Sequence, residues 1–323
     1  MPDLNKKANS SGFASKWWTF LAVIMIILCL PSTLAMAAER IRKPAVAGYF
    51  YPRDKEGLKK TVDDFISNVK QKQTTGKIIG LMSPHAGYVF SGQVAAYAYR
   101  QIKDRNYDTV VIIGPSHRAY IKGASVGNWD AYATPLGKVT VNKEIVDDLL
   151  SIGEPFHFIK EAHTSEHCIE TQIPFLQRVL GNFDIVPIVM GIPSLRYCKE
   201  ISKALSITVG KRNVLFVASS DMSHYPDYPN ANKVDRKTLS LIEKFDPELV
   251  FNSEAESLTK GIPNLSTTLC GLSSVVTVMM TVKQLGANAV KILHYANSGD
   301  VSIHGSRERR RVVGYGAVAF YKK

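Results

Sequence analysis

Cysteine is scarce in this chain of 323 residues, which contains four: Cys29, Cys168, Cys198 and Cys270. Cys29 lies in an N-terminal segment that we expect to be removed. The odd number of cysteines that remains argues against a disulfide framework, because at least one thiol stays unpaired.

Repeats of fixed period and low-complexity linkers are also absent from the sequence, which argues against a repeat array or a string of small domains. Hydrophobic residues make up 45% of the chain and charged residues 21%, so it can bury a substantial core. A single domain over residues 39–323 is the simplest organisation.

Acidic residues are outnumbered, with 28 Asp and Glu against 40 Lys and Arg and a net charge of +12. A basic chain can attract nucleic acid through counterion release. Here the basic residues are spread along the sequence, and the one dense cluster, 307–311, contains Glu308. We interpret that cluster as a solvated loop and expect no nucleic-acid partner.

One long apolar stretch, residues 17–30, stands apart from the rest. It follows Lys6, Lys7 and Lys16 and precedes Ala35-Met36-Ala37, the order of a secretory signal. We predict a signal peptide over residues 1–38 and an exported, periplasmic or secreted domain. The alternative is an uncleaved membrane anchor, although the stretch is short for a span of about 20 residues.

Three short aliphatic runs end abruptly at small polar residues. Residues 78–82 stop before His85, residues 110–113 stop before His117, and residues 214–218 stop before Asp221 and His224. Aliphatic runs that do not alternate with polar residues are typical of strands buried on both faces in a parallel sheet. Ligands in such folds bind beyond the carboxyl ends of the strands. The pattern therefore predicts that these side chains share one sheet edge.

The remaining pattern predicts an α/β domain with a central, largely parallel (mixed) sheet that helices cover on both faces. Thr164 and Ser165 are candidate N-caps of one long helix, which Pro174 should kink or interrupt. The expected helices are 55–69, 92–102, 145–152, 162–180, 196–209, 247–257 and 268–285. The further expected strands lie within 41–52, 123–141, 185–190, 291–295 and 312–321.

His85, His117 and Cys270 form the first candidate site. A single histidine at a strand end is usually structural, but three strand-end histidines and a cysteine at a helix start can meet at one point. Two imidazoles and a thiolate are good ligands for one transition metal. Three protein ligands leave positions open for water, oxygen or substrate, which is typical of a reactive site.

Two further pairs could take part. Asp221 and His224 could be ligands or an acid–base pair, unless Asp221 caps a turn. His167 and Glu170 lie three apart on one face of the helix predicted over 162–180, which leaves Glu166 on another face. That pair could bind metal, relay protons or form a surface patch.

These residues stand in motifs that resemble the Memo family, known in prokaryotes as AmmeMemoRadiSam system protein B. The resemblance covers about residues 42–321. It rests on SPHAGYVFSG at 83–92, GPSHR at 114–118, SEHCIETQIPFL at 165–176, SSDMSHY at 219–225, TTLCG at 267–271 and VVGYGAVAF at 312–320. The resemblance implies the fold of class III extradiol, LigB-like dioxygenases.

In those dioxygenases two histidines and a glutamate hold iron, and in Memo-like proteins a cysteine stands where the glutamate would be. The matching positions here are His85, His117 and Cys270, and the nearby acid–base pair matches Asp221 and His224. The resemblance thus implies binding of iron or copper and a redox role. It also implies AMMECR1-like and radical-SAM partners, which are cytoplasmic and conflict with the predicted export.

These residues and motifs are compatible with three functions. The leading one is a non-haem iron or copper redox protein that acts on a small molecule. The second is a non-catalytic module that binds phosphopeptides or anions in the same pocket, as animal Memo is described to do. The third is a zinc-dependent hydrolase.

Overall fold

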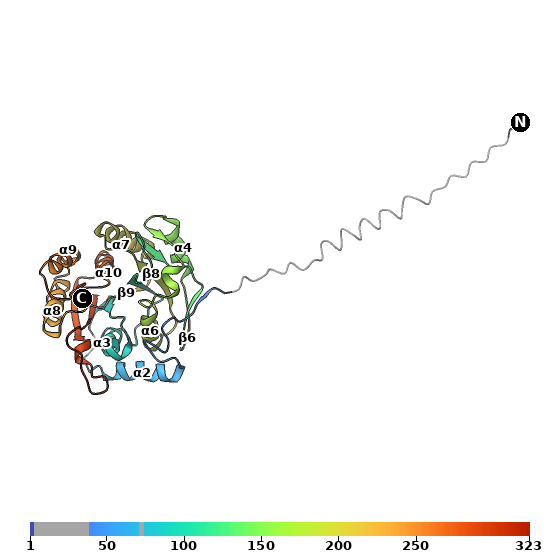
Figure 1. The fold of residues 1–323 in the computed structure, drawn as a ribbon. Helices are drawn as coiled ribbons and strands as arrows, with labels where there is room; N and C mark the ends of the chain where they lie inside the picture. Colours follow the sequence, from blue (N-terminus) through green and yellow to red (C-terminus); the bar gives the residue numbers. More distant parts are fainter. Residues whose placement is uncertain (3–38, 71–73) are drawn as a thin grey trace. The chain divides into compact units, whose positions relative to one another are not determined.

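The computed structural model describes residues 1–2, 39–70 and 74–323 (Figure 1). Residues 40–323 form one compact unit. The signal segment predicted over 1–38 lies outside the described residues except for its first two, so it stays a prediction. None of the helices within the described ranges has both the length and the hydropathy of a membrane span.

An eight-stranded mixed sheet runs through the domain in the order β10-β11-β2-β9-β3-β8-β4-β7. The four central strands β2, β9, β3 and β8 are parallel, whereas β11 pairs antiparallel with β10 and β2, and β4 antiparallel with β8. The strands are β2 (Lys77–Ser83), β3 (Thr109–Pro115), β4 (Ala124–Val126), β7 (Phe156–His157), β8 (Asp184–Met190), β9 (Val214–Ser219), β10 (Ala289–Asn297) and β11 (Gly314–Lys322).

A second, three-stranded sheet is made by β1 (Ile41–Arg42), β5 (Ala131–Thr134) and β6 (Gly137–Thr140). β5 and β6 form the hairpin predicted within 123–141. Its turn places Gly137 at a φ of 131°, a conformation that favours glycine.

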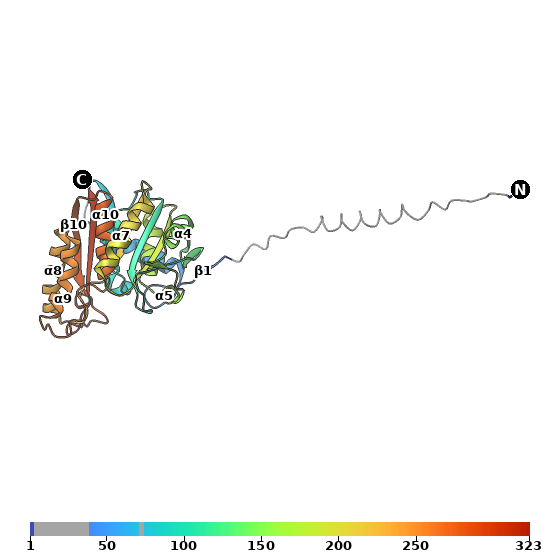
Figure 2. The same cartoon turned by 90° about the horizontal axis from the view of Figure 1, so that it is seen from above.

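Helices cover both faces of the large sheet (Figures 1 and 2). On one face α3 packs on β11 and β2, with α2 and α6 beside it. On the other face α10 packs on β9 and β3, with α7 next to it. The helices are α2 (Lys55–Asn68), α3 (Tyr88–Arg100), α4 (Lys143–Ser151), α5 (Glu161–Thr164), α6 (Ile173–Val179), α7 (Leu195–Val209), α8 (Tyr228–Glu243), α9 (Pro247–Leu258) and α10 (Leu272–Gln284). The predicted fold class is confirmed.

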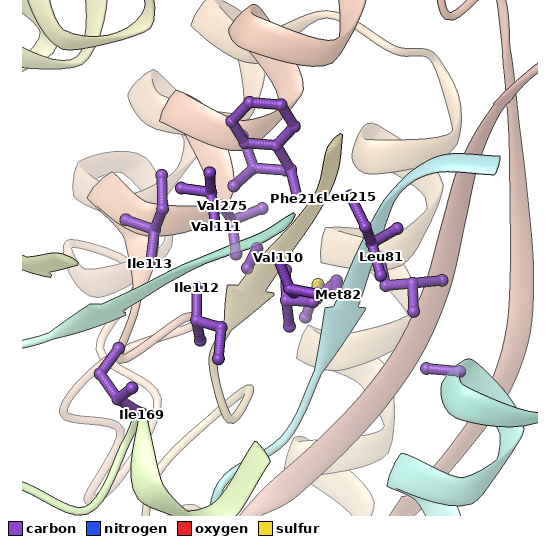
Figure 3. Packing of buried hydrophobic residues seen from close by; sticks show 14 of the residues in the cluster. Leu81, Met82, Val110, Val111, Ile112, Ile113, Ile169, Leu215, Phe216 and Val275 are labelled. Carbon is purple, nitrogen blue, oxygen red and sulfur yellow. The ribbon is translucent and has the colours of Figure 1, made fainter. Parts of the chain in front are cut away.

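The core lies between these layers and explains why the central strands lack alternation. Residues 110–113 of β3 have no exposed surface. Val111 and Ile113 point toward Val275 of α10, while Ile112 points toward Ile169 on the opposite face (Figure 3). A strand that is buried on both faces needs apolar side chains at every position.

The prediction of a single helix over 162–180 is wrong. The segment contains α5, a turn, a 3₁₀ turn η1 (Glu170–Gln172) and α6, and neither Thr164 nor Ser165 is a helix N-cap. Pro174 lies in the first turn of α6, where its missing amide breaks no helical hydrogen bond. The turn between α5 and η1 is what brings the segment into the site.

Two other boundaries bear on the site. α3 begins at Tyr88, before the range 92–102 that the sequence indicates and just beyond His85, where we expect its start. α10 begins at Leu272, so Cys270 precedes the helix rather than lying in it. α8 was not predicted at all.

Candidate functional site

The carboxyl ends of three neighbouring parallel strands build the site. β9 lies between β2 and β3, so the segments that follow these strands meet at one edge of the sheet. They carry His85, His117, Asp221 and His224, as predicted from the abrupt strand ends. Cys270 joins them from the loop before α10, through a hydrogen bond of 3.3 Å from its amide to the carbonyl oxygen of Asp221.

His85, His117 and Cys270 come together as a set of potential ligands. One ligand atom from each lies within 4.8 Å of the others. The Nε2 atom of His85 and the Sγ atom of Cys270 are 3.3 Å apart, and the two imidazole rings are nearly perpendicular with centroids separated by 5.2 Å. A nitrogen and a sulfur bound tetrahedrally to one ion at about 2.0 and 2.3 Å lie about 3.5 Å apart. The donor set therefore fits a transition metal.

Hydrogen bonds of Ser219 determine the tautomer of His85. The Ser219 hydroxyl donates its proton to the carbonyl oxygen of Cys168, at 2.6 Å, and accepts from Nε2 of Gln172, at 2.9 Å. Nδ1 of His85 lies 2.9 Å from the same oxygen and must donate to it. The lone pair of His85 is thus on Nε2, the atom that faces Cys270.

Glu166 determines the tautomer of His117 in the same way. Its Oε1 atom lies 2.9 Å from Nδ1 of His117, and its Oε2 atom accepts from the backbone amide of His117 at 2.7 Å. A carboxylate that holds one imidazole nitrogen leaves the other free to bind a metal and orients the ring. Burial opposes ionisation of Glu166, but its contacts with His117 lower the pKa of the carboxyl to about 2.

Glu166 is the residue that the sequence pattern places wrongly. Helical spacing puts it on a different face from the site and favours Glu170 instead. Because residues 165–169 form a turn, helical spacing does not apply there. Oε1 of Glu166 also accepts from the amides of His167 and Cys168, at 2.9 and 3.1 Å, which holds that turn.

Glu170 points away from the site into the domain interior. Its carboxylate pairs with the guanidinium of Arg42 and with the Tyr51 hydroxyl, and accepts from the amides of Ala45 and Val46 at 2.7 and 3.0 Å. Both members of the Arg42–Glu170 pair are buried. Glu170 therefore anchors the N-terminal strand and is not part of a catalytic pair with His167.

His167 does lie at the site. Its ring stacks on that of His117 with centroids 4.6 Å apart and is 5.3 Å from that of His85. Its Nδ1 atom is 3.3 Å from Oε1 of Glu166 and has no hydrogen-bond partner among the described residues. Burial and the neighbouring imidazoles lower the pKa of His167 to about 4, so its ring is neutral at pH 7. His117, Glu166 and His167 form a second group of potential ligands.

Asp221 and His224 lie in the segment that follows β9, and Asp221 contacts the turn that carries His85. Oδ1 of Asp221 accepts from the amides of His85 and Ala86, at 2.7 and 3.3 Å, so the carboxylate fixes the turn that carries His85. His224 is held by backbone pairing with Thr267 and Val313. Its buried Nε2 atom has no hydrogen-bond partner among the described residues. Burial lowers the pKa of His224, while Asp221 acts in the opposite direction.

Cys270 is half-buried, and its thiol lies against the backbone of Asp221. Its Sγ atom accepts from the amide of Asp221 at 3.3 Å. Burial raises the pKa of Cys270, and the charge of Asp221 adds to this. Burial likewise lowers the pKa of His85. The thiol and the imidazole are therefore neutral together, and a bound cation would be needed to favour the thiolate.

His163, which is not among the predicted site residues, is structural. It is buried, with Nε2 at 3.0 Å from the Ser125 hydroxyl and Nδ1 at 2.9 Å from the Tyr132 hydroxyl. Burial lowers its pKa to about 3.

The fold and the site together define a single-domain α/β protein with a candidate metal centre of two imidazoles and a thiol at the carboxyl edge of its sheet. Residues 42–319 match the family model described as a Memo-like protein. The chain therefore belongs to the Memo-like family, which confirms the resemblance drawn from its motifs.

Curated relatives described as MEMO1 family proteins support this membership. A protein of Nitrosopumilus maritimus is 34% identical over 285 residues, which cover 87% of this chain and 99% of the relative. A protein of Methanobrevibacter smithii is 35% identical over 293 residues, with coverage of 87% and 99%. A solved structure of an uncharacterized Escherichia coli K12 protein is similar with a TM-score of 0.48 at 14% identity, over 74% of this chain and 99% of that one.

Proposed function

We propose that this chain is a metal-dependent redox protein that holds iron or copper with His85, His117 and Cys270. The observation that carries the proposal is the convergence of three lone pairs. Ser219 and Glu166 occupy the Nδ1 atoms of the two histidines, so both Nε2 atoms are available, and Sγ of Cys270 lies 3.3 Å from one of them. A thiolate with two imidazoles is a soft donor set that suits copper and iron, with zinc as a competitor.

Bound iron or copper would supply electron transfer and activation of oxygen or substrate at its open positions. The side chain of His117 is 29% exposed, so a small molecule can approach the centre from that side. The Nε2 atom of His224 has no hydrogen-bond partner among the described residues, and burial lowers the pKa of this imidazole. In the tautomer that carries its proton on Nδ1, His224 would accept a proton from a substrate held at the centre. Asp221 positions the turn that carries His85. Its charge would stabilise the imidazolium that His224 becomes when it accepts the proton.

Metal analysis of the native protein tests this proposal. The untagged chain is purified without oxygen or chelators, its metal content is measured, and the loaded protein is titrated with oxidant and reductant. We expect one iron or copper ion per chain that changes oxidation state reversibly. His85→Ala and Cys270→Ser should each lose the ion, while His163→Ala, which alters an imidazole outside the site, should keep it.

Other metal contents would decide against the redox function. Zinc at full occupancy with no uptake of iron or copper would favour a zinc-dependent hydrolase. A chain that binds none of these ions would favour a binding module for peptides or anions, and the redox proposal would fail.

We also propose that the domain is exported, because residues 1–38 have the pattern of a secretory signal. N-terminal sequencing of the protein from the producing cell is expected to begin near residue 38 or 39. An intact N-terminus on protein from the cytoplasm would contradict export and would restore AMMECR1-like and radical-SAM proteins as partners.

A further inference from the structure

The Cys270 loop, residues 259–271, connects α9 to α10. Its end is bonded to the segment that follows β9. Cys270 and Asp221 exchange two contacts there, and the amide of Gly271 donates to the Ser220 hydroxyl at 2.9 Å. The part of the loop before Cys270 lies outside the named helices and strands, so its backbone groups need partners from elsewhere in the fold.

Glu254 of α9 supplies such a partner. Its carboxylate accepts from the hydroxyl of Thr267 at 2.8 Å, from the amide of Thr268 at 3.0 and 3.1 Å, and from the hydroxyl of Thr268. Thr268 is 2% exposed, so water competes little for these bonds. Hydrogen bonds to an ionised acceptor are about twice as strong as those between neutral groups. One side chain therefore ties two consecutive residues of the loop to a helix.

Thr267 carries this anchor into the site. Its hydroxyl, which donates to Glu254, also accepts from the amide of Leu269 at 3.2 Å and so fixes the turn that leads to Cys270. Its carbonyl oxygen accepts from the amide of His224 at 3.2 Å. The motif TTLCG at 267–271 thus contains more than a ligand, because its two threonines join the cysteine to Glu254.

We propose that Glu254 is a positioning residue that holds the thiol of Cys270 within reach of His85. The Sγ atom of Cys270 and the Nε2 atom of His85 are 3.3 Å apart, and this separation depends on where the Cys270 loop lies. Metal sites lose affinity when the groups that support a ligand are removed. As a support of the metal centre, this inference rests on the proposed function; as an anchor of the Cys270 loop, it does not.

Alkylation of the metal-free chain tests the anchor without any metal. The chain is treated with iodoacetamide at one pH, and mass spectrometry follows the peptide that contains Cys270. Cys168 and Cys198 are buried and report on opening of the whole domain. We expect Glu254→Ala to raise the alkylation rate of Cys270 severalfold and to leave the two buried thiols unmodified. Thr268→Val removes only the hydroxyl bond and should raise the rate less, and Thr268→Ser should restore the wild-type rate.

Metal selectivity separates positioning of the thiol from general damage to the site. Thiolate favours Cu(I), whereas imidazoles suit Ni(II). In competition with chelators of known affinity, Glu254→Ala should bind Cu(I) about tenfold or more weakly, as is typical when the support of a ligand is lost. It should bind Ni(II) like the wild type. An equal loss of affinity for both ions would overturn the inference.

The matched control is Glu256→Ala on the same helix. Glu256 is exposed and pairs with Lys237 at 3.4 Å and with Lys260 at 2.6 Å, so the variant removes the same charge from α9 without contact to the Cys270 loop. It should match the wild type in both assays.

Thermal unfolding curves establish that each variant is folded. Wild-type alkylation of Cys270 in both Glu254→Ala and Thr268→Val would overturn the inference. So would faster alkylation with unchanged affinity for Cu(I). If Glu254→Ala does not fold, Thr268→Val carries both measurements. A wild type that binds no metal refutes the proposed function, and the alkylation rates then decide the inference alone.

Discussion

Replacing Glu166 by glutamine tests whether a carboxylate orients His117 for metal binding. In the wild type both carboxylate oxygens accept from His117, one from its Nδ1 atom and one from its backbone amide. Glutamine has the same shape but only one oxygen, so its NH₂ group must face one of these two donors. If the NH₂ group faces Nδ1, the imidazole turns away or its proton moves to Nε2, the nitrogen that should bind the metal. If the NH₂ group faces the backbone amide, the segment that carries His117 loses its anchor.

The magnitude follows from the place of Glu166 behind a ligand. Loss of such a partner typically weakens metal binding 10- to 100-fold, which corresponds to about 1.4–2.7 kcal/mol. Competition against a chelator of known affinity, followed by absorbance, measures this loss for iron and for copper. Glu166 also holds the amides of His167 and Cys168, so a thermal unfolding curve must accompany each titration.

The matched control is Glu161→Gln, which removes the same charge from an exposed position on α5. It should bind metal like the wild type. If Glu166→Gln keeps wild-type affinity while folded, Glu166 does not orient a ligand and the assignment of Nε2 of His117 as a donor is wrong.

Two predictions concern stability. Glu170→Ala should lower the free energy of unfolding by about 3–5 kcal/mol, because it leaves the buried guanidinium of Arg42 without its partner. Asp64→Ala breaks an exposed pair with Lys60 and should cost less than about 1 kcal/mol, so equal losses in urea titrations would contradict the buried anchor. Burial raises the pKa of Asp235 to about 7, and the folded chain therefore binds this proton more tightly than the unfolded chain between about pH 4 and 7. The wild type should lose stability relative to Asp235→Asn as the pH rises through that window, and a stability difference that is independent of pH would refute the shift.

The strand ends at His85, His117 and His224 could be predicted because the signal is local. An aliphatic run without alternation identifies a buried strand, and small polar residues mark where it stops. Parallel strands then place their carboxyl ends at one edge. Cys270 could be assigned to the same site only from the chemistry of its thiol and from the family resemblance. The residues next to it in the sequence do not indicate its contact with Asp221.

The choice between Glu166 and Glu170 could not be made from the sequence. The residues 162–180 look helical, and in a helix His167 and Glu170 would share a face. Their actual positions depend on partners that are distant in the sequence. Glu170 pairs with Arg42 in the interior, and Glu166 pairs with His117 at the site.

α8 was missed for a similar reason. Asp235 interrupts the apolar face of this helix. Its burial is balanced by Ser223, whose amide and hydroxyl donate to it at 2.9 and 3.0 Å, and by the Tyr295 hydroxyl at 2.8 Å. These partners belong to other elements of the fold and leave no trace in the helix sequence.

X-ray absorption spectroscopy of the metal-loaded chain tests the central assignment most directly. Two imidazoles and one thiolate predict one sulfur scatterer at about 2.3 Å and nitrogen scatterers at about 2.0–2.1 Å from the ion, if its bond lengths are those of zinc sites. The sulfur contribution should vanish in Cys270→Ser. A wild-type spectrum with oxygen and nitrogen scatterers alone would show that the ion sits elsewhere.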